Sequence, residues 1–568
     1  MKRREFVTLG TISMGILPVL GFPFNNSSEE NKPKWIIDLI ELNNTTIINL
    51  LKNQILDKTS KQYGGLKDGE DIPNPHSTNA LISRGIIGFT NSESAFYKSA
   101  DLKAKIILAA KYLRKIQHVD GTIDLLSTNF HSTPDTGFIV ERVTASCELL
   151  KETKVEESDE LFSELKAFLL AAGDALSVGG IHTPNHRWVV AAALTKINNL
   201  WPNPKYVKRA EQWLAENIDL DPDGQYTEKS TGGYSAIVNN ALITIASGLN
   251  KPELLDNVRK NLEMNFFFVH PNNEIVTDAS NRQDKGGIRT FEIYYFSYRY
   301  MAILDQNPQF AAMCQLIEKS YFSKISGDLD HFLEEKLLWR KLPKSKPFST
   351  SYAKFFPYSK LARIRRDSWD ATLLINNPNF LTFHKNKAIL QGLRINASFF
   401  GKGQFQSPTI KQEGNTWVMY NKLEGPYFQP VSKDKVDPMG EWNKMPKSVR
   451  TKSEVQFLET IVKVKEISGG LEVEFDLKGT DGVPVSMELI FRAGGKLYGV
   501  EQAVKEPNAY FLSKNEGTYT VGEDSIIFGP GKSEHKGRHL RGGLPEEPNS
   551  PSIYLTGFTP FKHVITLK

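Results

Sequence analysis

Residues 179–193 read GGIHTPNHRWVVAAA. Two glycines and a proline break the chain, polar and aromatic side chains follow, and an apolar run begins. Asn185 stands where the cap of a helix is expected, and Val189 to Ala193 continue as its apolar interior. The same order, a break rich in Gly, Pro, Asn or Asp followed by an apolar helix, recurs from about Lys34 to Leu333. This recurrence decides the fold class, because it places polar side chains at the starts of many helices.

Helix pairs of this kind can pack as a closed toroid, a solenoid or an irregular bundle. The polar breaks favour the toroid, because helix N-termini gathered at one end of a barrel would bring those breaks into one cleft. We therefore predict an incomplete (α/α) toroid, the catalytic domain, over residues 30–340. Its expected helices include Leu161–Leu176, Trp188–Leu200, Val207–Ile218, Ala236–Leu249, Glu253–Phe266 and Phe291–Leu304.

The pattern changes after about Pro343. Short, β-rich and often alternating segments follow, divided by Gly, Pro or Asn turns, which is typical of an antiparallel β-sandwich. We expect this domain over residues 351–568, behind a proline-containing linker at 341–350. The expected strands lie in Lys360–Asp370, Ala388–Phe400, Thr416–Tyr420, Glu454–Ile467, Gly470–Leu477, Val485–Phe491 and Ser552–Leu567.

The first 26 residues have the anatomy of an export signal. Lys2-Arg3-Arg4 precedes an apolar run from Leu9 to Phe22, and polar residues follow. This order indicates an exported protein, periplasmic or secreted. The arginine pair resembles the twin-arginine type, and the alternative is an ordinary secretory signal. No later run in the sequence is apolar and long enough to span a bilayer, so we expect no membrane contact after signal removal.

Composition excludes several function classes. The net charge of +5 over 568 residues gives no support to nucleic-acid binding, whereas it is compatible with an acidic substrate. Only Cys147 and Cys314 occur, so neither a disulfide framework nor a cysteine metal site is expected. Metal-binding His-x-x-x-His pairs with a nearby Glu, phosphate loops and dinucleotide glycine patterns are also missing from the sequence, which predicts no metal and no cofactor.

The break at 179–188 is the densest candidate site. Asn185, His186, Arg187 and Trp188 supply an amide, an imidazole, a guanidinium and an indole. Together these groups suit a sugar carboxylate, because they can neutralise it, exchange its proton and stack on its ring. The structural alternative is that Asn185 only caps the helix and Trp188 packs in the core.

Three further breaks add candidates. In DGQYTEKSTGGYS (residues 223–235), Tyr234 can act as acid or base and Tyr226 can bind substrate, although packed tyrosines are the alternative. In TDASNRQD (277–284), Arg282 can anchor a carboxylate, and surface ion pairing is its alternative. A lone His131 is as often structural as functional. The remaining expected substrate contacts are Asn129, Asn240, Asn281 and Arg289.

The segment Asp223-Gly224-Gln225-Tyr226 with Glu228, Ser230 and Tyr234 resembles the Asp-Gly…Glu-x-Ser…Tyr segment of heparinase II/III-type and related alginate lyases. It is also similar to the corresponding segment of chondroitin AC and hyaluronate lyases. The resemblance implies an incomplete toroid followed by antiparallel sheets. Two departures stand out: Lys229 occupies the place of the base His of chondroitin-type lyases, and the β region lacks the His-x-His-x-Asp pattern of heparinase-type sequences.

The chemistry that this resemblance implies is β-elimination on a uronic-acid-containing polysaccharide. Asn185 would neutralise the carboxylate, Arg282 would anchor it, and Tyr234 would protonate the leaving oxygen. The base remains open among His186, His131 and Tyr234. Two rival functions are a glycoside hydrolase on an (α/α) barrel and a non-catalytic glycan-binding protein. The hydrolase would need two facing carboxylates, for which Asp135, Glu228 and Asp284 are candidates.

Overall fold

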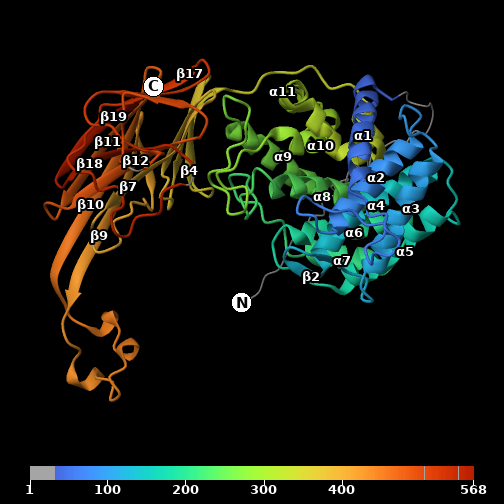
Figure 1. Ribbon diagram of the computed structural model, residues 1–568, viewed down its shortest axis with the longest axis horizontal. Coiled ribbons are helices and arrows are strands. Elements are labelled where there is room, and N and C mark those ends of the chain that lie inside the picture. The colour runs from blue at the N-terminus through green and yellow to red at the C-terminus, as the bar shows by residue number, and fades with distance from the viewer. Residues whose placement is uncertain (1–31, 505, 548) are drawn as a thin grey trace, which may run out of the picture.

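The computed structural model describes residues 32–504, 506–547 and 549–568, so the expected export signal lies outside the described residues. Helices fill the first part and strands the second, as predicted (Figure 1). Within the described residues, no helix is both long and apolar enough to cross a bilayer. The helices are α1 (Lys34–Lys52), α2 (Pro75–Thr90), α3 (Ala100–Ile116), α4 (Thr133–Glu152), α5 (Glu160–Val178), α6 (His186–Leu200), α7 (Pro204–Leu214), α8 (Tyr234–Gly248), α9 (Leu255–Asn265), α10 (Tyr295–Leu304), α11 (Pro308–Ile325) and α12 (Leu329–Glu334).

The helical domain has an inner and an outer layer. Helix α4 packs against α2 and α6, and α6 packs against α8, while α3, α5 and α7 cover these helices from outside. The sequence explains the layers: 11 of the 15 residues of α6 are buried, whereas α7 buries only Tyr206 and Ala210. Helices that are apolar all round belong inside, and amphipathic ones belong at the surface. This is the incomplete (α/α) toroid that the break pattern predicts.

The inner helices begin at one end of the toroid. The imidazole of His76, at the start of α2, lies 3.7 Å from the carboxylate of Asp135, at the start of α4. Phe138 of α4 in turn packs edge-on against His186, the first residue of α6, with 6.3 Å between ring centres. The polar breaks before these helices therefore meet, as the sequence indicates.

The second domain is a β-sandwich of two sheets. One has the strand order β13-β16-β17-β19-β11-β10-β9-β8, and the other β14-β15-β18-β12-β7-β6-β5-β4-β3. All pairings between the described strands are antiparallel except β15 with β18. The bounds are β3 (Ser351–Phe356), β4 (Leu361–Arg366), β5 (Trp369–Leu374), β6 (Leu381–Lys385), β7 (Ala388–Ala397), β8 (Ile410–Glu413), β9 (Thr416–Phe428), β10 (Lys452–Ile467), β11 (Gly470–Gly479), β12 (Pro484–Phe491), β13 (Lys496–Tyr498), β14 (Glu501–Gln502), β15 (Ala509–Phe511), β16 (Gly517–Val521), β17 (Asp524–Gly529), β18 (Ser552–Phe558) and β19 (Phe561–Leu567). A small hairpin, β1 (Ile123–Leu125) with β2 (Asn129–Ser132), belongs to the helical domain.

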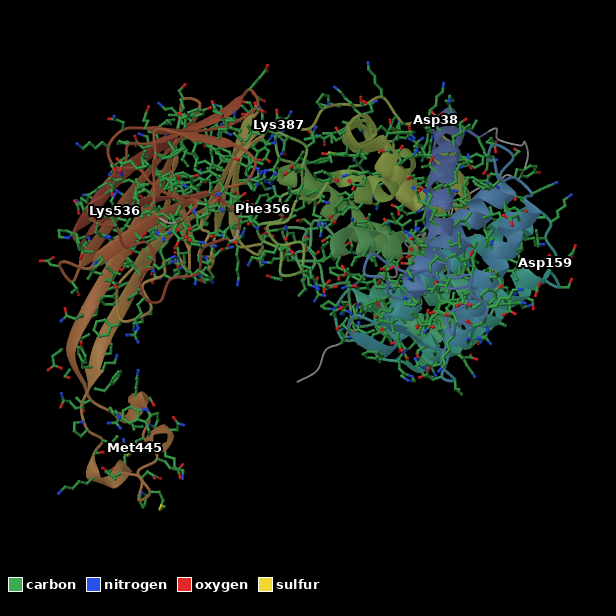
Figure 2. The ribbon with its side chains drawn as sticks, viewed as in Figure 1. Asp38, Asp159, Phe356, Lys387, Met445 and Lys536 are labelled. Atoms are coloured by element: carbon green, nitrogen blue, oxygen red, sulfur yellow. The ribbon has the colours of Figure 1, made fainter. Side chains whose placement is uncertain are left out.

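The two domains share a packed junction. Phe268, which follows α9, lies in one apolar cluster with Phe356 and Leu361 of the β domain. Figure 2 labels Phe356 on the side of the β domain that faces the toroid. The guanidinium of Arg363, fully buried, donates from Nε to the carbonyl of Phe267 over 3.0 Å. Burial of both apolar and charged groups across this junction fixes the β domain beside the loops of the toroid.

Candidate active site

The centre of the candidate site joins four side chains from three loops. Asn185 donates from Nδ2 to Oε2 of Glu228 over 2.7 Å. The other oxygen of Glu228 lies 3.6 Å from Nε of Arg282. The guanidinium of Arg282 lies over the ring of Tyr234, 4.9 Å from its centre. An amide, a carboxyl, a guanidinium and a phenol thus form one continuous group, the Asn185 cluster.

Asp284 holds the loops that carry this cluster. Its buried carboxylate accepts hydrogen bonds from Ser230 Oγ at 2.9 Å, Ser280 Oγ at 2.5 Å and the backbone N–H of Gly232 at 2.8 Å. Ser230 Oγ also accepts from the backbone N–H of Tyr234 at 3.1 Å. One carboxylate therefore ties the loop before α8 to the loop that contains Arg282, and places Tyr234 as the first residue of α8.

The side chain of Asn185 is hydrogen-bonded within the site and does not cap the helix that follows it. Although it occupies the N-cap position of α6, its side chain makes no capping hydrogen bond to any described residue. Instead, Nδ2 is held by Glu228 and, at 3.2 Å, by Oγ1 of Thr183. Oδ1 is buried without a hydrogen-bond partner in the described part of the chain. An oriented amide with a free oxygen is available for a ligand.

Glu228 and His186 are shifted toward their neutral forms by burial. Burial raises the pKa of Glu228, against the opposing effects of Asn185 and Arg282. Burial, together with neighbouring His182, lowers the pKa of His186 to about 4. The ring centres of these two histidines are 4.7 Å apart. At neutral pH His186 is therefore an uncharged imidazole beside the cluster, the protonation state that a base or a hydrogen-bond acceptor requires.

The β1–β2 hairpin supplies the edge of the site. Asn129 donates to Asp135 over 3.0 Å, and exposed His131 pairs through Nδ1 with Asp120 at 2.7 Å while stacking on His118. Asn129, His131 and His182 line one open depression of about 560 Å³. These contacts place His131 at the rim, whereas His186 lies at the cluster.

Three predicted substrate contacts are engaged within the protein. Trp188 is fully buried and donates from Nε1 to Asp219 over 3.1 Å. Tyr226 is also buried, with its hydroxyl donating to Asn239 at 2.7 Å. Arg187 pairs with Asp219 at 2.9 Å and lies over the Trp188 ring. Trp188 and Tyr226 thus complete the core behind the site, as the structural alternative for these residues expects, and Arg187 braces the loop beside it.

Three other predicted contacts border the site. Asn240 of α8 lines a cavity inside the toroid. Asn281 is exposed, and its backbone N–H donates to the carbonyl of Glu228 at 3.1 Å. Arg289 packs along Gly232, where an added Cβ would lie 2.4 Å from Cγ of the arginine. Gly232 is thus required for the close approach of these two loops.

The sequence interpretation missed two structural roles. From the sequence, Glu228 is a candidate acid of the hydrolase alternative, yet in the structure it orients Asn185. Its place in the Glu-x-Ser part of the resembling segment is the signal that pointed to it. Asp284 was treated in the same way, although its oxygens are occupied by the loop hydrogen bonds. No pattern in the sequence identifies it as their acceptor, because two of its three partners are 52 and 54 residues away.

One group among the described residues could hold a metal ion. His270, Asp370 and His384 are buried at the domain junction, and their ligand atoms lie within 4.8 Å of one another. Asp370 is also 2.7 Å from the guanidinium of Arg363. Although burial alone would raise the pKa of Asp370, Arg363 and His270 hold it well below its usual range. Nδ1 of His384 is buried without a hydrogen-bond partner among the described residues, so these three side chains form a candidate metal site that the sequence patterns do not predict.

The sequence matches no protein-family model and no curated protein. The fold, however, is similar to solved structures of polysaccharide lyases. A Paenibacillus xanthan lyase superposes with a TM-score of 0.58 at 10% identity, over 94% of this chain and 57% of that one. Heparinase III superposes with a TM-score of 0.56 at 12% identity, over 96% of this chain and 87% of that one. Chondroitin AC lyase of Streptomyces coelicolor A3, in complex with chondroitin sulphate, gives 0.55 at 12% identity, over 96% and 80%.

These likenesses show the fold, a helical toroid followed by β-sheets. At these identities they do not assign a substrate. This chain spans 57% of the length of the xanthan lyase.

Proposed function

We propose that this protein is an exported polysaccharide lyase that cleaves a uronic-acid-containing polysaccharide by β-elimination and leaves an unsaturated uronate. The observation that carries the proposal is the Asn185 cluster, in which Glu228 orients the amide and Arg282 lies over the phenol of Tyr234. Export rests on the basic and apolar order of residues 1–26.

Removing the C5 proton of a uronate is difficult because the carbanion that forms is high in energy. Neutralising the adjacent carboxyl lowers this cost. The free Oδ1 of Asn185 accepts a hydrogen bond from the acid form of that carboxyl, and Arg282 stabilises the charge that develops on it. The interaction with Arg282 strengthens as negative charge moves from C5 onto the carboxyl, which lowers the barrier, whereas Oδ1 of Asn185 holds the acid proton that keeps the carboxyl neutral.

Proton transfer falls to Tyr234 and His186. Tyr234 protonates the glycosidic oxygen as the C4–O bond breaks and the C4–C5 double bond forms. The C5 proton goes to His186, which is neutral at neutral pH, or to Tyr234 itself in its ionised form. His131 is less well placed for this role, because it lies at the exposed rim, where its Nδ1 pairs with Asp120.

The hydrolase alternative requires two carboxylates facing the glycosidic bond. Asp284 accepts three hydrogen bonds. Asp135 accepts hydrogen bonds from Asn129 and Ser132. Oδ1 of Asp135, without a hydrogen bond among the described residues, lies 3.7 Å from the imidazole of His76, and of the three acids only Glu228 belongs to the Asn185 cluster. A lone carboxyl beside an amide and a phenol suits elimination better than hydrolysis.

A panel of uronate polymers tests the proposal. The protein is incubated with each polymer, and ultraviolet absorbance and reducing ends are followed together. Elimination raises both, because each cut creates a conjugated double bond and a new reducing end. Reducing ends without absorbance would mean a hydrolase. Binding with neither signal on any polymer would mean a non-catalytic glycan-binding protein.

A further inference from the structure

A cavity of about 600 Å³ lies inside the ring of inner helices. Its walls come from α2, α4 and α8, including His76 near the start of α2 and Arg84 two turns deeper. Eight residues of helix between them correspond to a depth of about 12 Å. This size and depth suit one or two sugar rings, since pockets for small ligands occupy roughly 300–1,000 Å³.

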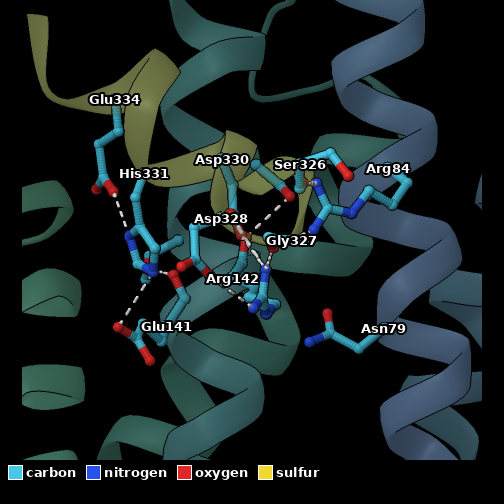
Figure 3. A network of polar contacts seen from close by, with 12 residues as sticks. Asn79, Arg84, Glu141, Arg142, Ser326, Gly327, Asp328, Asp330, His331 and Glu334 are labelled. Carbon is cyan, nitrogen blue, oxygen red and sulfur yellow. Dashed lines mark hydrogen bonds and ion pairs between the residues drawn. The ribbon is translucent and has the colours of Figure 1, made fainter. Parts of the chain in front are cut away.

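The inner end of the cavity is closed by the segment that contains η4 (Ser326–Asp328) and α12. Arg84 donates to the carbonyl of Ser326 at 2.6 Å and also to that of Gly327. Arg142 donates to Gly327 at 3.1 Å and to Asp330 at 2.8 Å (Figure 3). The guanidinium groups of Arg84 and Arg142, from neighbouring helices, thus hold this segment in place. We call the segment the floor of the cavity. A polymer threaded through the toroid would need an exit here, and this floor blocks it.

The charged side chains at the floor of the cavity bind one another or the backbone. Arg142 lies between Asp330 and Asp328, and His331 lies 3.5 Å from Glu141. Although burial alone would raise the pKa of Asp330, Arg142 holds it well below its usual range. Arg142 is ion-paired and Arg84 donates to two backbone carbonyls, so the hydrogen bonds of both guanidinium groups are directed at the inner end of the cavity and not at a carboxylate within it. Its ligand is therefore an uncharged part of the substrate.

The upper walls carry neutral hydrogen-bonding groups. Oδ1 of Asn79, Oγ of Ser83 and Oδ1 of Asn240 belong to lining residues and have no hydrogen-bond partner within the described chain. Asn79 and Ser83 are 3% and 1% exposed, so the two side chains are more than nine-tenths buried. In Figure 3 the Asn79 side chain points toward the space beside Arg142. Unpaired buried groups destabilise a fold unless a ligand satisfies them, and sugar hydroxyls provide both donors and acceptors.

The cavity adjoins the Asn185 cluster. Ile237, which lines it, stands one turn after Tyr234 on the same face of α8. Phe138, which also lines it, contacts the ring of His186. A sugar beside the bond to be cleaved can therefore enter the cavity.

On this basis we propose that the cavity is a closed subsite for the uncharged sugar at the end of the polysaccharide. The protein then shortens its substrate from one end instead of cutting within it. This inference rests on the proposed lyase function, and it adds the direction from which the substrate is attacked.

The size of the products tests this directly in the unaltered protein. Whichever polymer of the panel gives absorbance is followed by size-exclusion chromatography and viscosity during the first tenth of the reaction. Attack from an end releases one small product from the start, with little loss of viscosity. A ladder of intermediate sizes with an early collapse of viscosity would overturn the inference while leaving the lyase function intact. No absorbance on any polymer would instead overturn the function on which it rests.

Filling the cavity is the second test. Ala80→Phe places a ring among the lining residues of α2, and Ala104→Phe, at an exposed position of α3, is its matched control. We expect Ala80→Phe to raise KM on the order of 10-fold, with a smaller change in kcat, and the control to behave as the wild type. Ser83→Ala, which preserves the shape, should raise KM less. An unchanged KM in a folded Ala80→Phe protein would overturn the subsite.

Discussion

Nδ2 of Asn185 lies 2.7 Å from Oε2 of Glu228, and both side chains are buried. The two residues come from different breaks in the helical pattern, 43 positions apart. Their contact turns a residue at the start of α6 into an oriented amide whose oxygen stays free for a ligand. This hydrogen bond shows that the Asn185 side chain is oriented by Glu228 and does not cap α6.

Glu228→Gln should lower activity and raise stability together. The amide keeps the size of the side chain but changes how it holds Asn185, so we expect kcat/KM to fall about 100-fold. Because burial raises the pKa of Glu228, its ionised form costs stability, and that cost grows as pH rises through the unfolded value toward the folded one. The variant, which cannot ionise, should therefore melt at a higher temperature at pH 7. Lower stability at pH 7 would contradict this account.

The lowered pKa of His186 predicts how the stability of the protein changes in acid. Its pKa is lowered to about 4, so the folded protein keeps it neutral while the unfolded chain begins to take up the proton near its ordinary value. Its contribution to stability is therefore present above the ordinary value and is lost as pH falls toward 4. Chemical denaturation between pH 4 and 7 should show this slope in the wild type and a weaker one in His186→Gln. If His186 is the base, kcat/KM should decline only near pH 4.

Asp284→Ala should separate the loop before α8 from the loop that contains Arg282. Three hydrogen bonds to a buried carboxylate are lost, so we expect about 3 kcal/mol less stability and a fall in kcat of about 100-fold. Denaturant unfolding and initial rates measure the two effects. Asp481→Ala, at an exposed turn of the β domain, is the control and should change neither. Full activity in folded Asp284→Ala would show that the loops need no anchor.

Trp188→Phe decides whether this residue is a core residue or a substrate contact. Because the indole is fully buried and bonded to Asp219, the variant should lose about 2 kcal/mol of stability. Its KM should match that of the wild type, since no substrate reaches the ring. A large rise in KM without loss of stability would restore Trp188 as a substrate contact.

Much of the helical domain could be predicted from the sequence because its inner helices are apolar and their breaks are polar. The expected Trp188–Leu200 and Ala236–Leu249 correspond to α6 and α8. Side-chain direction could not be predicted. Tyr226 and Tyr234 stand in similar loop contexts, yet Tyr226 is buried against Asn239 and Tyr234 faces Arg282. Asn239, the partner of Tyr226, lies on α8 and is itself held by Asn261 of α9, an arrangement that the local sequence around Tyr226 does not reveal.

The strands were harder to predict. Lys360–Asp370 was expected as one segment, but a turn at Asp367, which has a φ of 46°, divides it into β4 and the start of β5. Similarly, Ser552–Leu567 contains two strands, β18 and β19. Strands such as β6, which is buried on both faces, lack the alternation that reveals an exposed strand. Local sequence therefore revealed the sandwich but not its strand count.

The most direct test of elimination at the Asn185 cluster compares Tyr234→Phe with the wild type. Tyr420→Phe, on an exposed face of β9, is the matched control. Ultraviolet absorbance is followed on an acidic polysaccharide, alongside binding of the same polymer. We predict rising absorbance with the wild type and the control, and none with Tyr234→Phe, which should still bind. Undiminished absorbance from Tyr234→Phe, or cleavage by the wild type without any absorbance, would contradict the account.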